Sequence, residues 1–428
     1  MKFLKYTIFK NPYILKSADS EIKIKSIVLK DDEIYEIMDF QDIPQEIIKQ
    51  SKIIDLQDKL VLPGFINTHS HSVMSFFKGM ADDVDFESWL YKNMLPREEL
   101  LNEEMAYWGS LLSQMEMVKN GITSFADMYM FTDQIAKATI KTGMRAFISR
   151  GLASDNDEEW KRKIKENIDT IEKYNGFEDR IIIGFGPHAP YTVSEEHLKE
   201  TAKLAEKYNT HIQIHLLESK NENYDLSYIE KTHIFDVPVI AAHCVHVSDE
   251  DIKILSKHEV TVSHNPSSNL KLGNGMMPMK QMLEENINIT VGTDGSASNN
   301  SLNILKEIQL SSLYYKSKYK TDSIKNEEFL RMMWENGGFA FNQKIGRLDE
   351  DFKADLIVVN LNAPEFKPFD LQRLKSHILY SMNTSNIEAT MVGGKWIYKD
   401  YEFVNIKEDE VYENFSECYK EMENSLNN

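Results

Sequence analysis

Residues 180–219 read RIIIGFGPHAPYTVSEEHLKETAKLAEKYNTHIQIHLLES, and this stretch contains two apolar runs separated by an amphipathic segment. The runs at 180–190 and 210–219 are short and lack polar alternation, which is typical of strands that are buried on both faces. The segment 194–209 has the apolar spacing of a helix. The stretch therefore predicts two parallel strands joined by a helical crossover.

The same alternation of strand and helix continues in both directions along the chain. Further apolar runs are GITSFADMYM (121–130), MRAFISRG (144–151), VPVIAAHCVH (237–246), VTVSHNPSS (260–268) and INITVGTDGS (287–296). At least seven alternations favour a closed (β/α)8 barrel of the TIM type. A doubly wound open sheet is the alternative, but no glycine fingerprint follows a first strand to support it.

Both ends of the chain are patterned as strands outside the barrel region. KSIVLKDDEIYEIM (25–38) predicts a hairpin around Asp31-Asp32, and strand patterns return at 351–362 and 389–404. A charged helical stretch begins at Glu408. We expect residues 1–62 and 349–428 to form a small composite domain of the β-sandwich type with a C-terminal helix. The barrel would then occupy residues 63–348.

Composition and charge restrict the partners of this chain of 428 residues. The net charge is −19, which disfavours nucleic acid and anionic membrane as partners but not a small molecule. Cys244 and Cys418 are too few for a disulfide framework or a cysteine-rich zinc module. Lys2, Lys5 and Lys10 interrupt the N-terminal segment before a secretory apolar region forms. We expect a cytoplasmic protein, and a homo-oligomer is compatible with the sequence.

Several predicted strands end in metal-binding residue types. In a (β/α)8 barrel the active site lies at the C-terminal ends of the strands. His69 and His71 are two residues apart at the end of the run at 61–71, so on a strand they point to the same side. His215 ends one later run, and Asp294 follows another. Each signal is weak alone, but three imidazoles and one carboxylate make a suitable set for zinc or ferrous iron.

Three further residues near the strand ends are candidates, each with an ordinary structural explanation. Glu218 lies three residues after His215 and would face the same site only if the chain turns between them; otherwise it is a solvated carboxylate. His243 and His188 also end apolar runs, where a histidine is commonly hydrogen-bonded within a loop.

Longer blocks of the sequence resemble the amidohydrolase superfamily, and within it the 5'-methylthioadenosine/S-adenosylhomocysteine deaminases. These blocks are NTHSH (67–71), GFGPHAPY (184–191), IHLLES (214–219), AAHCVH (241–246), SHNPSSNLKLGNG (263–275), GTDGSASNNSLN (292–303) and ADLIVVNL (354–361). The resemblance covers nearly the whole chain. It implies one divalent metal ion, with zinc expected and ferrous iron as the alternative, held by His69, His71, His215 and Asp294. Members with two metals need a bridging lysine, which the run at 180–190 lacks.

The resemblance also implies catalytic roles for three residues. Glu218 would protonate the ring nitrogen, His243 would orient the attacking water, and Asp294 would take the proton of that water. The implied reaction is hydrolytic deamination of the adenine ring of S-adenosylhomocysteine or 5'-methylthioadenosine, with adenosine as a further candidate. The partner is therefore a small-molecule nucleoside.

Substrate-binding positions follow from the resemblance as well. Glu98 in LPREEL (95–100) would bind the ribose hydroxyls, and Trp89 in FESWL (86–90) would pack against the purine. Arg150 and His188 fall at substrate positions. A second arginine position falls near Arg162, where the segment 155–163 departs from the family in length and composition.

Three other functions remain open from the sequence. A triazine chlorohydrolase, or a guanine or cytosine deaminase, could share the metal site, but would have no use for Glu98 and Arg150. A catalytically silent barrel would not require Glu218 and His243. A nucleic-acid-editing deaminase is disfavoured because its PCxxC element is missing.

Overall fold

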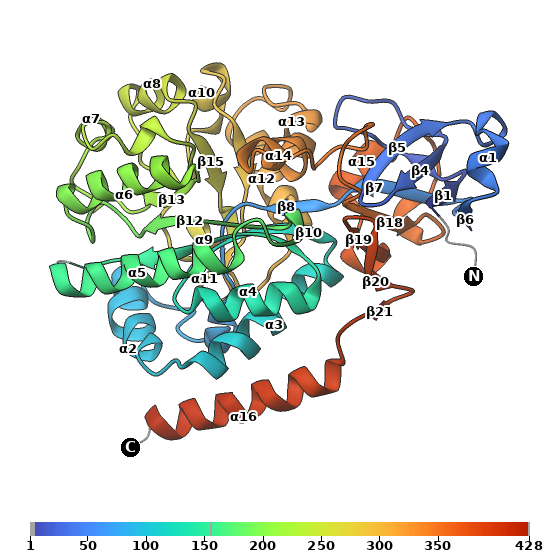
Figure 1. Cartoon of the computed structure of the whole chain (residues 1–428). Helices are drawn as coiled ribbons and strands as arrows, with labels where there is room; N and C mark the ends of the chain where they lie inside the picture. The colour runs from blue at the N-terminus through green and yellow to red at the C-terminus, as the bar shows by residue number, and fades with distance from the viewer. Residues whose placement is uncertain (1–4, 155, 427–428) are drawn as a thin grey trace. The chain divides into compact units, whose positions relative to one another are not determined.

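The computed structural model describes residues 5–154 and 156–426 (Figure 1). Lys2 of the N-terminal segment and Asp155 of the divergent segment 155–163 lie outside these residues. The chain divides into two compact units. The first comprises Met1–Ile66, Met117–Ser124 and Asn303–Asn405, and the second comprises Asn67–Glu116, Phe125–Leu302 and Ile406–Asn428.

Eight strands form one sheet in the order β16-β15-β14-β13-β12-β11-β10-β8. Their bounds are β8 (Phe65–Asn67), β10 (Ile122–Tyr129), β11 (Arg145–Leu152), β12 (Ile181–Pro187), β13 (Ile212–Leu216), β14 (Val239–His243), β15 (Thr261–His264) and β16 (Ile289–Val291). Neighbouring strands from β11 to β16 are parallel. The backbone N–H of Thr68 donates to the carbonyl of Val291 at 3.1 Å, which joins the first strand to the last. The predicted (β/α)8 barrel of the TIM type is confirmed.

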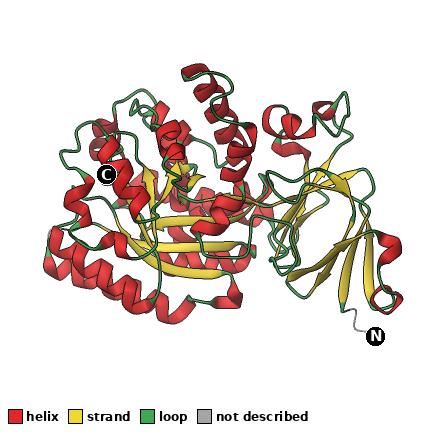
Figure 2. Cartoon of the chain, turned by 90° about the horizontal axis from the view of Figure 1, so that it is seen from above, coloured by secondary structure: helices red, strands yellow, loops and turns green. Residues whose placement is uncertain are grey.

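Helices cover the outside of this sheet (Figure 2). The longer ones are α3 (Glu103–Lys119), α4 (Thr132–Thr142), α5 (Asp157–Tyr174), α6 (Glu195–Tyr208) and α8 (Asp249–Lys257), and shorter ones are α7 (Leu226–Glu230), α9 (Pro266–Lys271), α10 (Met279–Glu284) and α11 (Ser296–Asn299). Three further helices, α12 (Ile304–Lys318), α13 (Asn326–Met333) and α14 (Glu335–Ala340), belong to the first compact unit. Helices α4 and α5 pack on β11, and α5 and α6 pack on β12. The Ser194 side chain caps α6, so β12, α6 and β13 reproduce the predicted strand–helix–strand unit.

The first unit contains a four-stranded sheet, β5-β4-β1-β6, and a seven-stranded sheet, β21-β20-β19-β18-β7-β2-β3. The bounds are β1 (Tyr6–Lys10), β2 (Tyr13–Ile14), β3 (Lys23–Ile24), β4 (Ser26–Lys30), β5 (Glu33–Met38), β6 (Ser51–Asp55), β7 (Lys59–Pro63), β18 (Leu356–Asn360), β19 (Ile387–Val392), β20 (Lys395–Lys399) and β21 (Glu402–Phe403). Two short helices, α1 (Gln45–Ile48) and α15 (Leu374–Tyr380), also belong to it. Strands β4 and β5 form the hairpin predicted around Asp31-Asp32.

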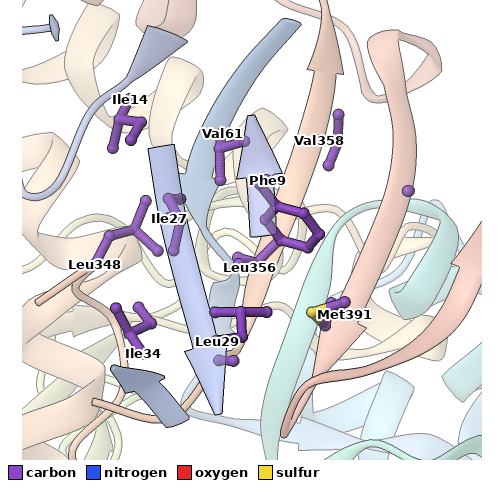
Figure 3. Close-up of a cluster of buried hydrophobic side chains, with 12 residues drawn as sticks. Phe9, Ile14, Ile27, Leu29, Ile34, Val61, Leu348, Leu356, Val358 and Met391 are labelled. Carbon is purple, nitrogen blue, oxygen red and sulfur yellow. The ribbon is translucent and has the colours of Figure 1, made fainter. Parts of the chain in front are cut away.

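Strands from the two ends of the chain share the seven-stranded sheet of the first unit. β18 pairs antiparallel with β7, with Leu356 opposite Pro63 and Val358 opposite Val61. A cluster of buried apolar side chains, including Phe9, Val61 and Leu356, fills the interior (Figure 3). The N- and C-terminal β segments therefore build one small β domain, as expected. The domain boundaries at 62/63 and 348/349 stay a prediction, because the two compact units divide the chain at other positions.

The C-terminal helix α16 (Glu408–Leu426) belongs to the second unit. The ring of Phe415 stacks on the ring of Phe76, with centroids 4.2 Å apart and an interplanar angle of 15°. Among the described residues, no helix has both the length and the apolar character that crossing a membrane requires.

Candidate metal centre and active site

A short pair of strands brings Asp294 beside the two histidines that follow β8. Strand β9 (Ser70–His71) pairs in parallel with β17 (Asp294–Gly295), which places Gly295 opposite His71. The Oδ1 atom of Asp294 lies 3.1 Å from His71 Nε2 and 3.7 Å from His69 Nε2. The two ends of the barrel sequence therefore meet in one cluster.

The remaining imidazoles converge on the same point. The ring centroid of His215 lies 4.8 Å from that of His69 and 5.5 Å from that of His71. The potential ligand atoms of His69, His71 and Asp294 lie within 4.8 Å of one another, as do those of His69, His215 and His243. The structure thus brings together all four predicted metal ligands and places His243 beside them.

The hydrogen bonds of the cluster fit a metal ion at its centre. His71 donates from Nδ1 to the carbonyl of Met128 at 2.6 Å, and His215 donates from Nδ1 to the carbonyl of His188 at 2.7 Å. In its neutral form, a histidine that donates from Nδ1 presents an unprotonated Nε2, and this is the form that binds a metal. The Nε2 atom of His69 is buried and has no hydrogen-bond partner among the described residues. A divalent cation would satisfy that atom.

Burial keeps two of these imidazoles neutral. It lowers the pKa of His69 well below the usual value, and it lowers the pKa of His215 in the same way, with the neighbouring imidazoles adding to the effect. Because only the neutral imidazole carries the lone pair that binds a metal, both groups are in the ligand form at neutral pH.

Glu218 faces the cluster because the chain turns after β13. Leu217 has a left-handed backbone with φ of 47°, which supplies the turn that the spacing of His215 and Glu218 requires. The Oε2 atom of Glu218 lies 3.5 Å from His243 Nε2. Burial raises the pKa of Glu218 to about 7, so this carboxyl group is protonated in a large fraction of the protein molecules at neutral pH. A protonated carboxyl beside a metal site can act as a general acid.

A cavity of about 330 Å³ opens onto these groups, a volume within the range of small-molecule sites. Its lining includes His71, His215, Glu218, His243 and Asp294. Four of the five predicted substrate-binding residues also line it, namely Trp89, Glu98, Arg150 and His188. The metal centre and these four residues therefore share one cavity.

Two of the substrate candidates have polar partners within the cavity wall. The carboxylate of Glu98 accepts a hydrogen bond from the hydroxyl of Tyr129 at 2.6 Å, and burial raises the pKa of Glu98. His188 shares a hydrogen bond of 2.9 Å with the hydroxyl of Thr192, and burial lowers the pKa of His188 to about 4. His188 is therefore neutral near pH 7 and does not supply positive charge to the cavity.

Positive charge in the cavity comes from Arg150 and from a residue that the sequence did not single out. Arg150 is buried and pairs with Glu166, with Nε and Oε2 3.1 Å apart. Lys163 also lines the cavity, and its side chain is 13% exposed. Its Nζ donates to the carbonyl of Ala153 at 2.6 Å and pairs with Glu159 at 2.7 Å.

Arg162, the fifth substrate candidate, does not line this cavity. Its side chain is 58% exposed and pairs with Glu166. Helix α5 buries Trp160 and Ile164, and residues three or four apart share one face of a helix. Lys163 lies three residues after Trp160 and therefore shares its inward face, whereas Arg162 faces solvent. The apolar spacing of this helix is the sequence signal that could have distinguished them.

Similarity to known proteins identifies the family of this chain. A model of the amidohydrolase family matches residues 60–397. The 5-methylthioadenosine/S-adenosylhomocysteine deaminase of Thermotoga maritima is 43% identical over 87% of this chain and 90% of its own length. The 5'-deoxyadenosine deaminase of Methanocaldococcus jannaschii is 40% identical over 89% of this chain and 93% of its own length. Among solved structures, a zinc-bound adenosine deaminase from Xanthomonas campestris has a TM-score of 0.89 at 22% identity, over 98% of both chains. The chain belongs to the amidohydrolase family.

Proposed function

We propose that this protein is a metal-dependent hydrolase that deaminates the adenine ring of nucleosides of the S-adenosylhomocysteine and 5'-methylthioadenosine type. The products would be the inosyl compound and ammonia. One observation carries the proposal: the four expected metal ligands cluster beside a cavity that is lined by Glu218, whose pKa is raised, and by the carboxylate of Glu98. The names of relatives with about 40% identity support the same substrate class.

The residues that would hold the metal ion are His69, His71, His215 and Asp294. Imidazole and carboxylate suit zinc, with ferrous iron as the alternative. When bound, a divalent cation lowers the pKa of water so that hydroxide is available near neutral pH.

The protein's own groups would then move the protons of the reaction. Glu218 donates a proton to N1 of the adenine as the nucleophile adds to C6, which prevents negative charge from accumulating on the ring. Asp294 takes a proton from the attacking water and passes it to the departing ammonia. His243 positions that water through Nε2, because its Nδ1–H is bonded to Asn269 Oδ1 at 2.8 Å.

The rest of the cavity would bind the nucleoside. Glu98 accepts hydrogen bonds from the ribose hydroxyls, and Trp89 packs against the purine. Arg150 and Lys163 provide the positive charge that a carboxylate at the end of the 5'-substituent would meet. A small ring without ribose would leave the Glu98 carboxylate with the Tyr129 hydroxyl as a partner but without the ribose hydroxyls, which has a free-energy cost in a partly buried site.

Ammonia release and the ultraviolet change from adenine to hypoxanthine test the proposal directly. The zinc-loaded protein would be assayed with S-adenosylhomocysteine, 5'-methylthioadenosine, 5'-deoxyadenosine, adenosine, guanine and a chlorotriazine. We expect turnover of the 5'-modified adenine nucleosides. Turnover of guanine or the triazine alone would overturn the substrate assignment, and no turnover at all would favour a silent barrel.

A matched pair of variants can test whether Lys163 binds the carboxylate at the end of the 5'-substituent. Lys163→Met is expected to lower kcat/KM for S-adenosylhomocysteine by about 10- to 100-fold, the usual effect of losing a hydrogen bond to a charged group. For 5'-methylthioadenosine, which has no carboxylate, we expect a change of about twofold or less. Arg162→Met, at the neighbouring exposed position, should leave both values unchanged. Equal losses on both substrates in Lys163→Met would show that this lysine does not recognise the carboxylate.

A further inference from the structure

The segment of residues 263–275, SHNPSSNLKLGNG, enters the reaction described above only through Asn269, which orients His243. In the structure its helix α9 and the turn after it supply three buried side chains, one to each proton-handling group. Ser268 Oγ donates to Asp294 Oδ2 at 2.6 Å, and Asn269 Oδ1 accepts from His243 Nδ1 at 2.8 Å. Asn274 Nδ2 donates to Glu218 Oε1 at 2.9 Å. One segment of the chain thus contacts the acid, the base and the water-positioning group.

The bond from Asn274 distinguishes the two oxygens of Glu218. An amide nitrogen only donates hydrogen bonds, so Oε1 accepts this one. Because a carbonyl oxygen accepts better than a carboxyl hydroxyl oxygen, the bond favours the form of the neutral carboxyl group that carries its proton on Oε2. This is the oxygen that lies 3.5 Å from His243 Nε2. Resting on the proposed function, we propose that Asn274 is a positioning residue that keeps the transferable proton of Glu218 on the oxygen facing the substrate ring.

The backbone around Asn274 is built to hold that side chain in place. The backbone N–H of Asn274 donates to the carbonyl of Asn269 at 2.9 Å, which closes the turn after α9. Gly273 and Gly275 on either side have φ values of 75° and 101°, a region that other residues rarely adopt. The position of the amide is therefore fixed by the turn and does not depend on contact with the substrate.

Variants of Asn274 test this inference by separating turnover from binding. Asn274→Ala and Asn274→Leu remove the donor, the second with the same number and branching of side-chain heavy atoms. We expect kcat for 5'-methylthioadenosine to fall by about 10- to 100-fold, while KM stays within about twofold. The melting temperature and the metal content should match those of the unmodified protein. Asn274→Gln retains an amide donor and should recover part of kcat.

A matched control and a double variant make the result specific. Leu270→Ala changes an exposed residue of helix α9, just before the turn that contains Asn274, and should leave kcat unchanged. Because Asn274 acts through Glu218, adding Asn274→Ala to Glu218→Gln should lower kcat by about twofold or less, far from additively. Normal kcat in Asn274→Ala, or a loss shared with KM or metal content, would overturn the inference while the proposed function stands. An inactive unmodified protein would overturn both.

Discussion

Glu218→Gln is expected to lower kcat for adenine nucleosides by about 10³-fold, within the usual range for loss of a general acid. Glutamine has nearly the same shape and can accept the hydrogen bond that Asn274 gives to Oε1, but its amide cannot transfer a proton to N1 of the ring. The measurement is steady-state ammonia release with 5'-methylthioadenosine. KM should change little, because the acid acts as the ring gains electrons and not when the substrate binds.

Metal content is the internal control for this prediction. Glu218 is not among the four expected ligands, so Glu218→Gln should retain the same amount of metal per chain as the unmodified protein. Glu335→Gln provides a second control, since burial also raises the pKa of that carboxyl group although it belongs to the other compact unit. If Glu218→Gln kept more than a tenth of the activity, another group would have to supply the proton.

The clustering of the four candidate ligands was predictable because these residues obey the geometry of the barrel. His69 and His71 are two apart at the end of a strand, and His215 and Asp294 end later apolar runs. The ends of parallel strands converge at one face, so the sequence order alone brings such residues together. The structure adds the short pairing of β9 with β17, which no sequence pattern predicted.

The direction of the Glu218 side chain depends on a backbone conformation that the sequence does not reveal. The distance of three residues between His215 and Glu218 predicts opposite directions on a straight strand. The left-handed conformation of Leu217 reverses that result, and leucine gives no local signal for such a conformation. The sequence pattern left Glu218 open as a candidate, the resemblance to known deaminases implied its role, and the structure supplies the physical reason for its orientation.

The cavity walls and the groups behind them were the least predictable part. Lys163 and Arg162 are adjacent basic residues, and their different exposure follows from the phase of α5. The segment with Ser268, Asn269 and Asn274 has polar side chains without helical or strand periodicity, so its contacts depend on tertiary folding. The stacking of Phe415 on Phe76 likewise joins residues far apart in the chain.

Asp294→Asn is expected to abolish activity, with a fall in kcat of about 10⁴-fold or more, because this residue would act as ligand and base together. The carboxylate is anchored from several sides. Oδ2 accepts bonds from Ser268 and Ser298 at 2.6 and 3.0 Å, and the backbone N–H of Gly295 donates to Oδ1 at 2.7 Å. An asparagine could keep part of this pattern, but it lacks the negative charge and the basic oxygen. The metal content per chain and the rate of ammonia release should both fall.

Metal removal separates the two roles of Asp294. Treating the unmodified protein with a chelator should stop ammonia release, and adding back zinc or ferrous ion should restore it, so the better ion can be identified from the recovered kcat. In Asp294→Asn, even saturating metal should not restore turnover, because the proton acceptor is still missing. Asp82→Asn, at a surface carboxylate paired with Lys271, should respond to chelation and reconstitution as the unmodified protein does. Full recovery of Asp294→Asn at high zinc would leave Asp294 as a ligand only and would require a different group to take the proton of the attacking water.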